Sequence, residues 1–443
     1  MFKEAFNIRQ LSVAQVVTHL QTPLYRNAYA LMLSNGLTSV LGFVYWVVAA
    51  RLYTEAQVGI GFAIIASMTF LSGMSQLNMI GVLTRFIPTA GQATLRLVGI
   101  AYLSSIVTTA VTATIFVLGL SIWGDENFVF ASSWFLVWFV LANIGYSIFA
   151  IQDGVLTGLR RTIWVPIENA LFAVAKIIFL FAFAEAMLGI DNGIFASWAI
   201  PIVLAIIPVN ILLFWRLIPH HMETTRDQAQ PIQVRQLFSF ITGDYLGSLL
   251  GRAAIAAFPL MIISTLGEES NGYFGIAWQI AFTLQLVSIS MTTSLTVESA
   301  VDEQQFGEYG RRSLAHLARI LAPLVLVIVV GAPFILQIFG ENYAAQGVNT
   351  LRFLALAALP YAVISLYVSY CRVRKRTSRI VFVSGSLFLL SVSASYLLLP
   401  AFGIVGVGMA WFASQVLIAA VLIATELRPI LRPNARDRVR VTE

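Results

Sequence analysis

The 443-residue chain has little charge and a single cysteine. Asp, Glu, Lys and Arg together make up 11% of its residues, whereas a soluble domain uses about 25%. With 58% of its residues hydrophobic, the chain has too few charged groups to cover a water-facing surface of this size. The one cysteine, Cys371, excludes an internal disulfide. The composition therefore predicts an all-α polytopic membrane protein.

Sequence signatures of nucleotide hydrolysis and metal binding are also missing. No GxxxxGK[ST] loop is present, so we expect no ATP hydrolysis by this chain. His220 and His221 are adjacent in a polar loop with no cysteine nearby, and we expect no metal site and no cofactor. The net charge of +6 comes from basic residues in loops between apolar runs, which gives no indication of a nucleic-acid partner. If the chain moves a solute, the energy would have to come from an ion gradient, with H⁺ or Na⁺ as the coupling ion, from the membrane potential, or from consumption of the product outside.

Twelve apolar stretches are each long enough to cross the ~30 Å hydrocarbon core as a helix. They cover approximately residues 27–50, 58–83, 97–123, 129–151, 163–184, 193–215, 238–266, 273–297, 314–339, 348–371, 380–399 and 402–426. The longest polar loop separates the first six from the last six. We therefore expect two six-helix lobes, with the boundaries 1–26 (interfacial N-terminal segment), 27–215 (N-lobe), 216–236 (linker), 237–426 (C-lobe) and 427–443 (basic tail).

The basic residues give the expected orientation. Most of the 27 lysines and arginines fall in the two terminal segments and in every second loop, densest around residues 372–379. The intervening loops are short and acidic, and their basic residues are Arg51 and Arg352. The positive-inside rule then places both termini on the cytoplasmic side.

A faint internal repeat supports the two-lobe plan. LYTEAQVGIGFA (52–63) aligns with LGEESNGYFGIA (266–277), and both lie at the turn between the first and second span of a lobe. Because six spans separate the copies, both run in the same direction. This predicts a parallel pseudo-two-fold repeat about an axis along the membrane normal, a plan found among transporters.

Five charged residues lie within or at the edge of spans: Arg51, Glu168, Lys176, Asp244 and Arg252. Glu168 and Lys176 are eight residues apart, which puts them on one broad helix face about 12 Å apart along the axis. The same spacing relates Asp244 to Arg252. Charged groups at membrane depth usually face a cavity or pair with one another.

These five residues allow two interpretations. As a functional set, Arg252, Lys176 and Arg51 would contact an anionic substrate, and Asp244 and Glu168 would balance those charges or carry a coupling ion. As a structural set, they would form buried ion pairs that fix helix packing, with Arg51 extending to the membrane interface. The sequence leaves both interpretations open.

The stretch 27–68 resembles the start of the oligosaccharide and O-antigen flippases. The resemblance rests on Ser34-Asn35-Gly36, Gly42, Ala49-Ala50-Arg51-Leu52 and the Glu55…Gly59…Gly61 turn, and GYFGIAWQIA (272–281) looks like the equivalent signature of the second lobe. This family belongs to a superfamily that also includes lipid II flippases and multidrug and toxin extrusion transporters. The resemblance implies a V-shaped pair of six-helix bundles in the plasma (inner) membrane.

The resemblance also implies a function. The chain would move an undecaprenyl-pyrophosphate-linked oligosaccharide from the inner to the outer leaflet by alternating access, for lipopolysaccharide O-antigen or related surface polysaccharide. Its partners would be that lipid-linked oligosaccharide, the surrounding membrane lipids and other polysaccharide-assembly proteins. One alternative is an ion-coupled antiporter of drugs or small molecules from the same superfamily. Another is a membrane-embedded polysaccharide polymerase, which the short outer loops disfavour.

Overall fold

The computed structural model describes residues 23–123, 133–184, 192–226, 234–299 and 306–428, which form helices joined by short turns. The first half makes one bundle, the N-lobe, from these elements: α2 (Pro23–Leu52), α3 (Glu55–Ser75), α4 (Met79–Ala90), η1 (Gly91–Ala93), α5 (Thr94–Trp123), α6 (Ser133–Gly158), α7 (Trp164–Ala184), α8 (Gly193–Leu212), η3 (Leu213–Leu217) and α9 (Ile218–Thr224). The second half makes the C-lobe from these: α10 (Val234–Leu266), α11 (Glu268–Ser299), α12 (Phe306–Gln337), α13 (Glu341–Leu356), α14 (Ala358–Val373), α15 (Thr377–Phe402), α16 (Ile404–Leu422) and η6 (Ile423–Leu427).

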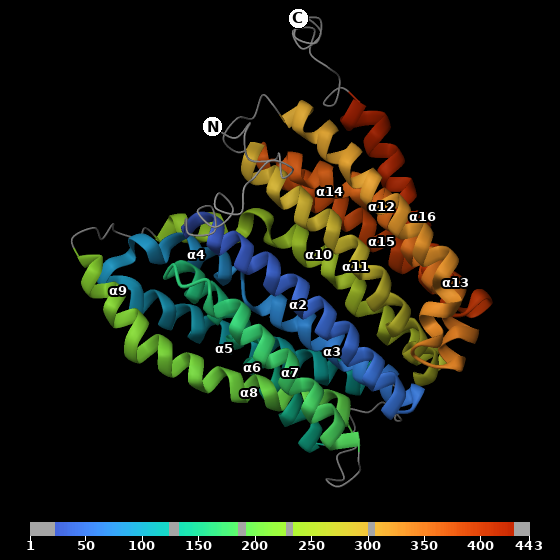
Figure 1. Cartoon of the computed structure of the whole chain (residues 1–443), viewed down its shortest axis with the longest axis horizontal. Coiled ribbons are helices and arrows are strands. Elements are labelled where there is room, and N and C mark those ends of the chain that lie inside the picture. The colour runs from blue at the N-terminus through green and yellow to red at the C-terminus, as the bar shows by residue number, and fades with distance from the viewer. Residues whose placement is uncertain (1–22, 124–132, 185–191, 227–233, 300–305, 429–443) are drawn as a thin grey trace, which may run out of the picture.

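The two bundles converge at one end and spread apart toward the other (Figure 1). The converging end carries the α2–α3 and α10–α11 turns, and we call it the distal end. The positive-inside rule predicts that this end faces the outer side of the membrane. The arrangement agrees with the V shape that the family resemblance implied.

Equivalent helices pack in the same way in both lobes, as the sequence repeat predicts. In the N-lobe the first span, α2, packs on α7, and α7 packs on α8. In the C-lobe α10 packs on α15, and α15 packs on α16. The last span of each lobe also ends in a π-helix, η3 after α8 and η6 after α16. The predicted two-lobe, all-α fold is therefore confirmed.

The described helices account for the predicted spans. Eleven helical segments between Glu55 and Leu427 are long and apolar enough to cross a membrane. The first span, α2, is 30 residues long, and its apolar part is described from Thr38 to Leu52. Little of the predicted segments 1–26 and 427–443 falls within the described residues.

The second predicted span ends earlier than expected. Residues 58–83 were expected to form one helix, but α3 ends at Ser75, and Leu77 and Asn78 adopt positive φ angles of 47° and 58°. Asn tolerates this left-handed conformation better than most residues, and the left-handed conformation interrupts the helix. The following α4 is a separate amphipathic helix whose buried side lies at Met79, Val82, Leu83, Ile87 and Ala90.

Two further breaks involve proline and glycine. The predicted span 348–371 is two helices, α13 and α14, which meet at Ala357. Pro360 lacks the N–H that would bond to the carbonyl of Leu356, so the helix cannot continue unbroken at this point. Gly403, with a φ of 58°, separates α15 from α16. The predicted boundary near residues 400–402 is therefore correct.

The predicted linker is shorter than expected. The N-lobe helix continues from α8 through η3 and α9 to Thr224, well beyond the predicted end at residue 215. His221 lies in this extension, with its Nε2 3.0 Å from the carbonyl oxygen of Ile87. The predicted linker 216–236 is thus helical in its first part, and the next helix, α10, begins at Val234.

The lobes meet along α3, which contacts both α10 and α11. At the distal end this contact is backbone against backbone: a Cβ atom on Gly59 would collide with the carbonyl of Glu268, and one on Gly272 with the carbonyl of Glu55. Asn271 is fully buried and donates a hydrogen bond of 2.8 Å to the Gly59 carbonyl. The two glycines allow α3 and α11 to approach this closely, as small residues do in membrane helix pairs.

Aromatic rings continue the junction toward the interior. Phe62 of α3 lies between Trp46 of its own lobe and Phe274 of α11, with centroid distances of 5.8 and 6.4 Å. Phe274 then contacts Trp278, which contacts Trp411 of α16. The largest buried apolar cluster therefore includes residues of both lobes.

Candidate functional site

Helix α7 turns both of its charged residues into the N-lobe. Its buried positions are Val165, Glu168, Phe172, Ala173, Lys176, Leu180 and Phe183, mostly three or four residues apart, so they form one stripe. Glu168 is 4% exposed and Lys176 is 7% exposed. The two side chains share a face, as their spacing predicts, and this face points into the bundle.

Aromatic rings surround the ammonium group of Lys176. Its Nζ lies 4.3 Å from the ring centroid of Trp198, 4.9 Å from that of Tyr45 and 5.5 Å from that of Phe172. The rings come from α8, α2 and α7, and we call them the ring cage. All three distances are within the ~6 Å at which cation–π attraction acts. The sequence predicted a buried lysine here, but gave no sign of the ring cage.

Glu168 is buried without an obvious partner. Neither of its carboxylate oxygens has a hydrogen-bond partner among the described residues. Asp153 of α6 is near enough to repel it electrostatically, and Asn169, the neighbour of Glu168, donates hydrogen bonds of 3.3 and 3.4 Å to the Asp153 carboxylate. Two acids therefore lie close together inside the N-lobe.

Asp153 was missed because the fourth span was predicted to end at residue 151. Helix α6 in fact continues to Gly158, which places Asp153 within the spanning segment. The signal was present in the sequence, since the apolar run GVLTGL follows Asp153 directly.

Arg252 lies on the side of α10 that faces the N-lobe. Its guanidinium group occupies the space beside Gly73 of α3, where a Cβ atom would lie 2.6 Å from Nη1. The side chain is exposed, and it makes no hydrogen bond or ion pair with another residue in the described ranges. About two turns earlier on α10, the Tyr245 hydroxyl donates a hydrogen bond to the Met74 carbonyl. The side chain of Asp244 lies outside the described part of the structure.

Arg51 joins the lobes at the distal end. Its Nε and Nη2 donate hydrogen bonds of 2.8 and 2.9 Å to the carbonyls of Ile338 and Gln337, at the C-terminal end of α12. Beside this contact, Asn342 Nδ2 donates a hydrogen bond of 2.8 Å to Glu55 Oε1. A cation at a helix C-terminus is stabilised by the helix dipole and by the unpaired carbonyls. Arg51 thus connects the lobes in this conformation, at the opposite end of α3 from Arg252.

We expect Arg51→Ala to loosen the distal end, because it removes two charge-assisted hydrogen bonds between lobes. A loss of about 1 kcal/mol at this exposed site would raise the population of open conformations about fivefold. The readout is the maleimide labelling rate of Asn271→Cys, a buried position at the α3–α11 contact. Arg352→Ala is the matched control, since Arg352 bonds to Val329 and Asn349 within the C-lobe. Equal labelling in the two arginine variants would contradict the prediction.

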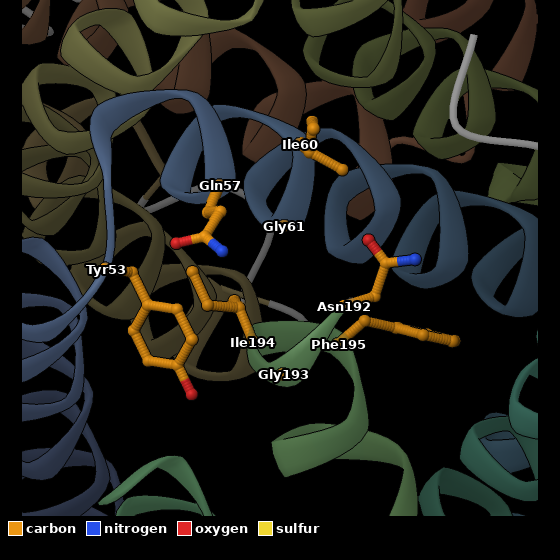
Figure 2. Close-up of a pocket in the computed structure, with 8 residues that line it drawn as sticks. All are labelled: Tyr53, Gln57, Ile60, Gly61, Asn192, Gly193, Ile194 and Phe195. Carbon is orange, nitrogen blue, oxygen red and sulfur yellow. The ribbon is translucent and has the colours of Figure 1, made fainter. Parts of the chain in front are cut away.

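The structure also contains a small cavity between α3 and the start of α8 (Figure 2). In Figure 2 the amides of Gln57 and Asn192 flank it from opposite sides, with Tyr53 close to Gln57. Its volume is ≈ 20 Å³, which is room for about one water molecule. This cavity is too small for a transported substrate.

The fold is shared with transporters of known structure. The family model described as MatE matches residues 253–397. A multidrug resistance MATE family transporter of the MOP superfamily, in an inward-facing conformation, is 14% identical, with a TM-score of 0.64 over 90% of this chain and 96% of that one. The lipid II flippase MurJ, in an inward closed conformation, is 13% identical, with a TM-score of 0.62 over 90% and 89% of the two chains.

A third similar structure is a MOP superfamily transporter from Pyrococcus furiosus. It is 17% identical, with a TM-score of 0.58 over 95% of this chain and 97% of that one. No curated protein matches the chain. The three similar structures are transporters or a flippase, not enzymes. The chain therefore has the fold of the MOP superfamily transporters, and much of its C-lobe matches the MatE family model.

Proposed function

We propose that this protein moves a polyprenyl-pyrophosphate-linked oligosaccharide from the inner to the outer leaflet of the plasma membrane, for surface polysaccharide biosynthesis. The observation that carries the proposal is Arg252. It is an exposed guanidinium group on a spanning helix, at the junction of the lobes, with no described partner. A charge at membrane depth costs several kcal/mol unless water or an opposite charge accompanies it. An anionic substrate would supply that opposite charge.

The chemistry of Arg252 suits a pyrophosphate head group. A guanidinium group presents a planar fork of N–H donors that matches two phosphate oxygens at once. Arg252 lies against Gly73 of the opposite lobe, so an anion bound to it would contact both lobes. MurJ, which has a similar fold, is a lipid II flippase, and this lends support to a lipid-linked substrate.

Movement of the lobes would expose the substrate to each side in turn. The contacts that would break and re-form are those of α3 with α10 and α11, together with the Arg51 contact at the distal end. Each consists of hydrogen bonds and close packing contacts along the junction of the two bundles. Such interfaces allow rigid-body rocking of one bundle against the other.

Glu168 and Asp153 are the groups on which a coupling proton would be held. Glu168 is buried and both of its oxygens lack described partners, so the neutral acid is buried at far lower cost than the carboxylate. A coupling Na⁺ would use the same oxygens. Binding or release of this cation inside the N-lobe would change the packing of α7 against α2 and α8.

The second candidate is an ion-coupled antiporter of organic cations. The two neighbouring acids of the N-lobe, Glu168 and Asp153, favour it, because carboxylates attract cations. The two candidates differ in the residue on which transport depends. A pyrophosphate substrate requires Arg252, whereas a cationic substrate requires the acids alone.

Arg252→Ala is expected to lower export of the lipid-linked oligosaccharide at least tenfold, since a bidentate charge-assisted contact is worth about 1.5–3 kcal/mol. Arg252→Lys should be intermediate, because it keeps the charge without the fork. The measurement is accumulation of lipid-linked glycan on the inner leaflet of cells depleted of the protein and complemented with each variant.

Arg319→Ala is the matched control, since Arg319 is exposed on α12, a helix that packs within the C-lobe. Accumulation that only wild type and Arg319→Ala relieve would support the proposal. Clearance by Arg252→Ala at the wild-type rate would make Arg252 structural. No accumulation upon depletion would favour the antiporter.

A further inference from the structure

We propose that the ring cage is a binding site for an organic ammonium ion, and that Lys176 occupies it permanently and so excludes organic cations from the N-lobe. The lysine is then a specificity-determining residue. The inference stands on the geometry of the N-lobe alone and does not depend on the identity of the transported substrate.

The ring cage has the geometry of an ammonium site. Three rings from three different helices approach one Nζ atom at 4.3, 4.9 and 5.5 Å from their centroids. Aromatic cages of this kind recognise quaternary ammonium groups, because the negative faces of the rings replace part of the cation's hydration. Three such contacts on one atom point to more than incidental packing.

The rings are the described partners of this ammonium group. Lys176 is 7% exposed and makes no hydrogen bond or ion pair with another residue in the described ranges. Glu168, the other charge on this face of α7, is two helical turns away, or about 12 Å along the axis. The ammonium group is thus held by ring faces rather than by a carboxylate.

Contacts that do not involve Lys176 hold the ring cage in place. The Tyr45 hydroxyl donates a hydrogen bond of 3.1 Å to the Ile194 carbonyl and lies 2.8 Å from Ser197 Oγ. Trp198 packs edge-on against Phe172 and Tyr45, with centroids 5.8 and 6.1 Å away. The three rings should therefore keep their positions when Lys176 is removed, and the site between them would be empty.

The size of the missing group defines the probe. Lys176→Ala keeps Cβ and removes three methylenes and the ammonium group, which together correspond to n-propylammonium. That ion should fill both the space vacated by the three methylenes of Lys176 and the ring cage. n-Propanol has the same number of heavy atoms and no charge, so it separates cation binding from simple filling of an apolar space.

The test is thermal unfolding of the purified full chain in detergent. Lys176→Ala is expected to show a saturable rise of about 2 °C or more in Tm with n-propylammonium, and a much smaller rise with n-propanol. Wild type and Lys176→Ala/Trp198→Ala should show no saturable rise. Equal effects of the two probes, a response in wild type, or survival of the response without Trp198 would each overturn the proposal.

A second measurement covers the case in which Lys176→Ala does not fold. Lys176→Met keeps the aliphatic chain and removes the charge, so a double-mutant cycle with Trp198→Ala isolates the ammonium–ring contact. The drop in Tm on Trp198→Ala should be clearly smaller in the Lys176→Met background. Additive drops would show that the rings do not sense the charge, and the proposal would fail. The flippase measurement above is independent of both outcomes.

Discussion

Glu168→Leu is expected to raise the stability of the protein and to abolish its transport. Glu168 is 4% exposed and has no described hydrogen-bond partner for either oxygen. A buried polar group without a partner costs about 1–3 kcal/mol, and an apolar side chain of similar size removes that cost. The same change removes the group on which a coupling ion would be held. Thermal unfolding and export are therefore expected to change in opposite directions.

Two controls make the Glu168 experiment decisive. Glu168→Gln keeps the shape and polarity but cannot carry the proton, so it should lose transport with little gain in stability. Glu269→Gln, at an exposed position of α11, should leave both the stability and the export rate unchanged within experimental error, as most surface changes do. A destabilised Glu168→Leu would mean that the carboxyl has a stabilising partner. Wild-type export in this variant would exclude a coupling role.

Gly272→Ala is expected to shift the protein strongly away from the conformation described here. The added Cβ would collide with the carbonyl of Glu55, a backbone atom that cannot rotate aside. Forcing two packed helices apart costs roughly 1–3 kcal/mol. A value of about 2 kcal/mol corresponds to a thirtyfold gain in conformations with α3 and α11 separated. Labelling of Asn271→Cys should rise by that factor.

Gly251→Ala on α10 is the matched control. Apart from the adjacent backbone of α10 itself, no atom lies within 4 Å of the position where its Cβ would be, and alanine favours a helix over glycine by about 1 kcal/mol. Gly251→Ala should thus keep the labelling rate and hold or raise Tm. The native Cys371 is buried, so both variants can be labelled in the natural background. A slow rate in Gly272→Ala would show that the helices already have room for a methyl group.

The candidate site was only partly accessible from the sequence. Eight-residue spacing was sufficient to place Glu168 and Lys176 on one helix face, since that depends on helix geometry alone. Asp153, the second acid near Glu168, was missed because a carboxylate near the end of a span looks like a loop residue. The ring cage could not be predicted, because Tyr45 and Trp198 lie on other helices and become neighbours of Lys176 only through packing.

The fold, too, was predictable from the sequence in some features and not in others. The two six-helix lobes were predictable because hydrophobic length and the placement of basic loops are local properties. The break between α3 and α4 was not, since the sequence remains apolar through it and the interruption depends on the backbone of Leu77 and Asn78. Arg51 was predicted either to contact substrate or to extend to the membrane interface. In this conformation it bonds to carbonyls nearly 290 residues away, a contact that local patterns cannot reveal.

The close approach of α3 and α11 at one end has a mechanical consequence. Helix α11 has 32 residues, which makes it about 48 Å long at 1.5 Å per residue. A rotation of α11 by about 10° around the glycine contact would displace the far end of this helix by about 8 Å. A small change of packing at the glycine contact would therefore move the far end of α11 much further than it moves the contact itself.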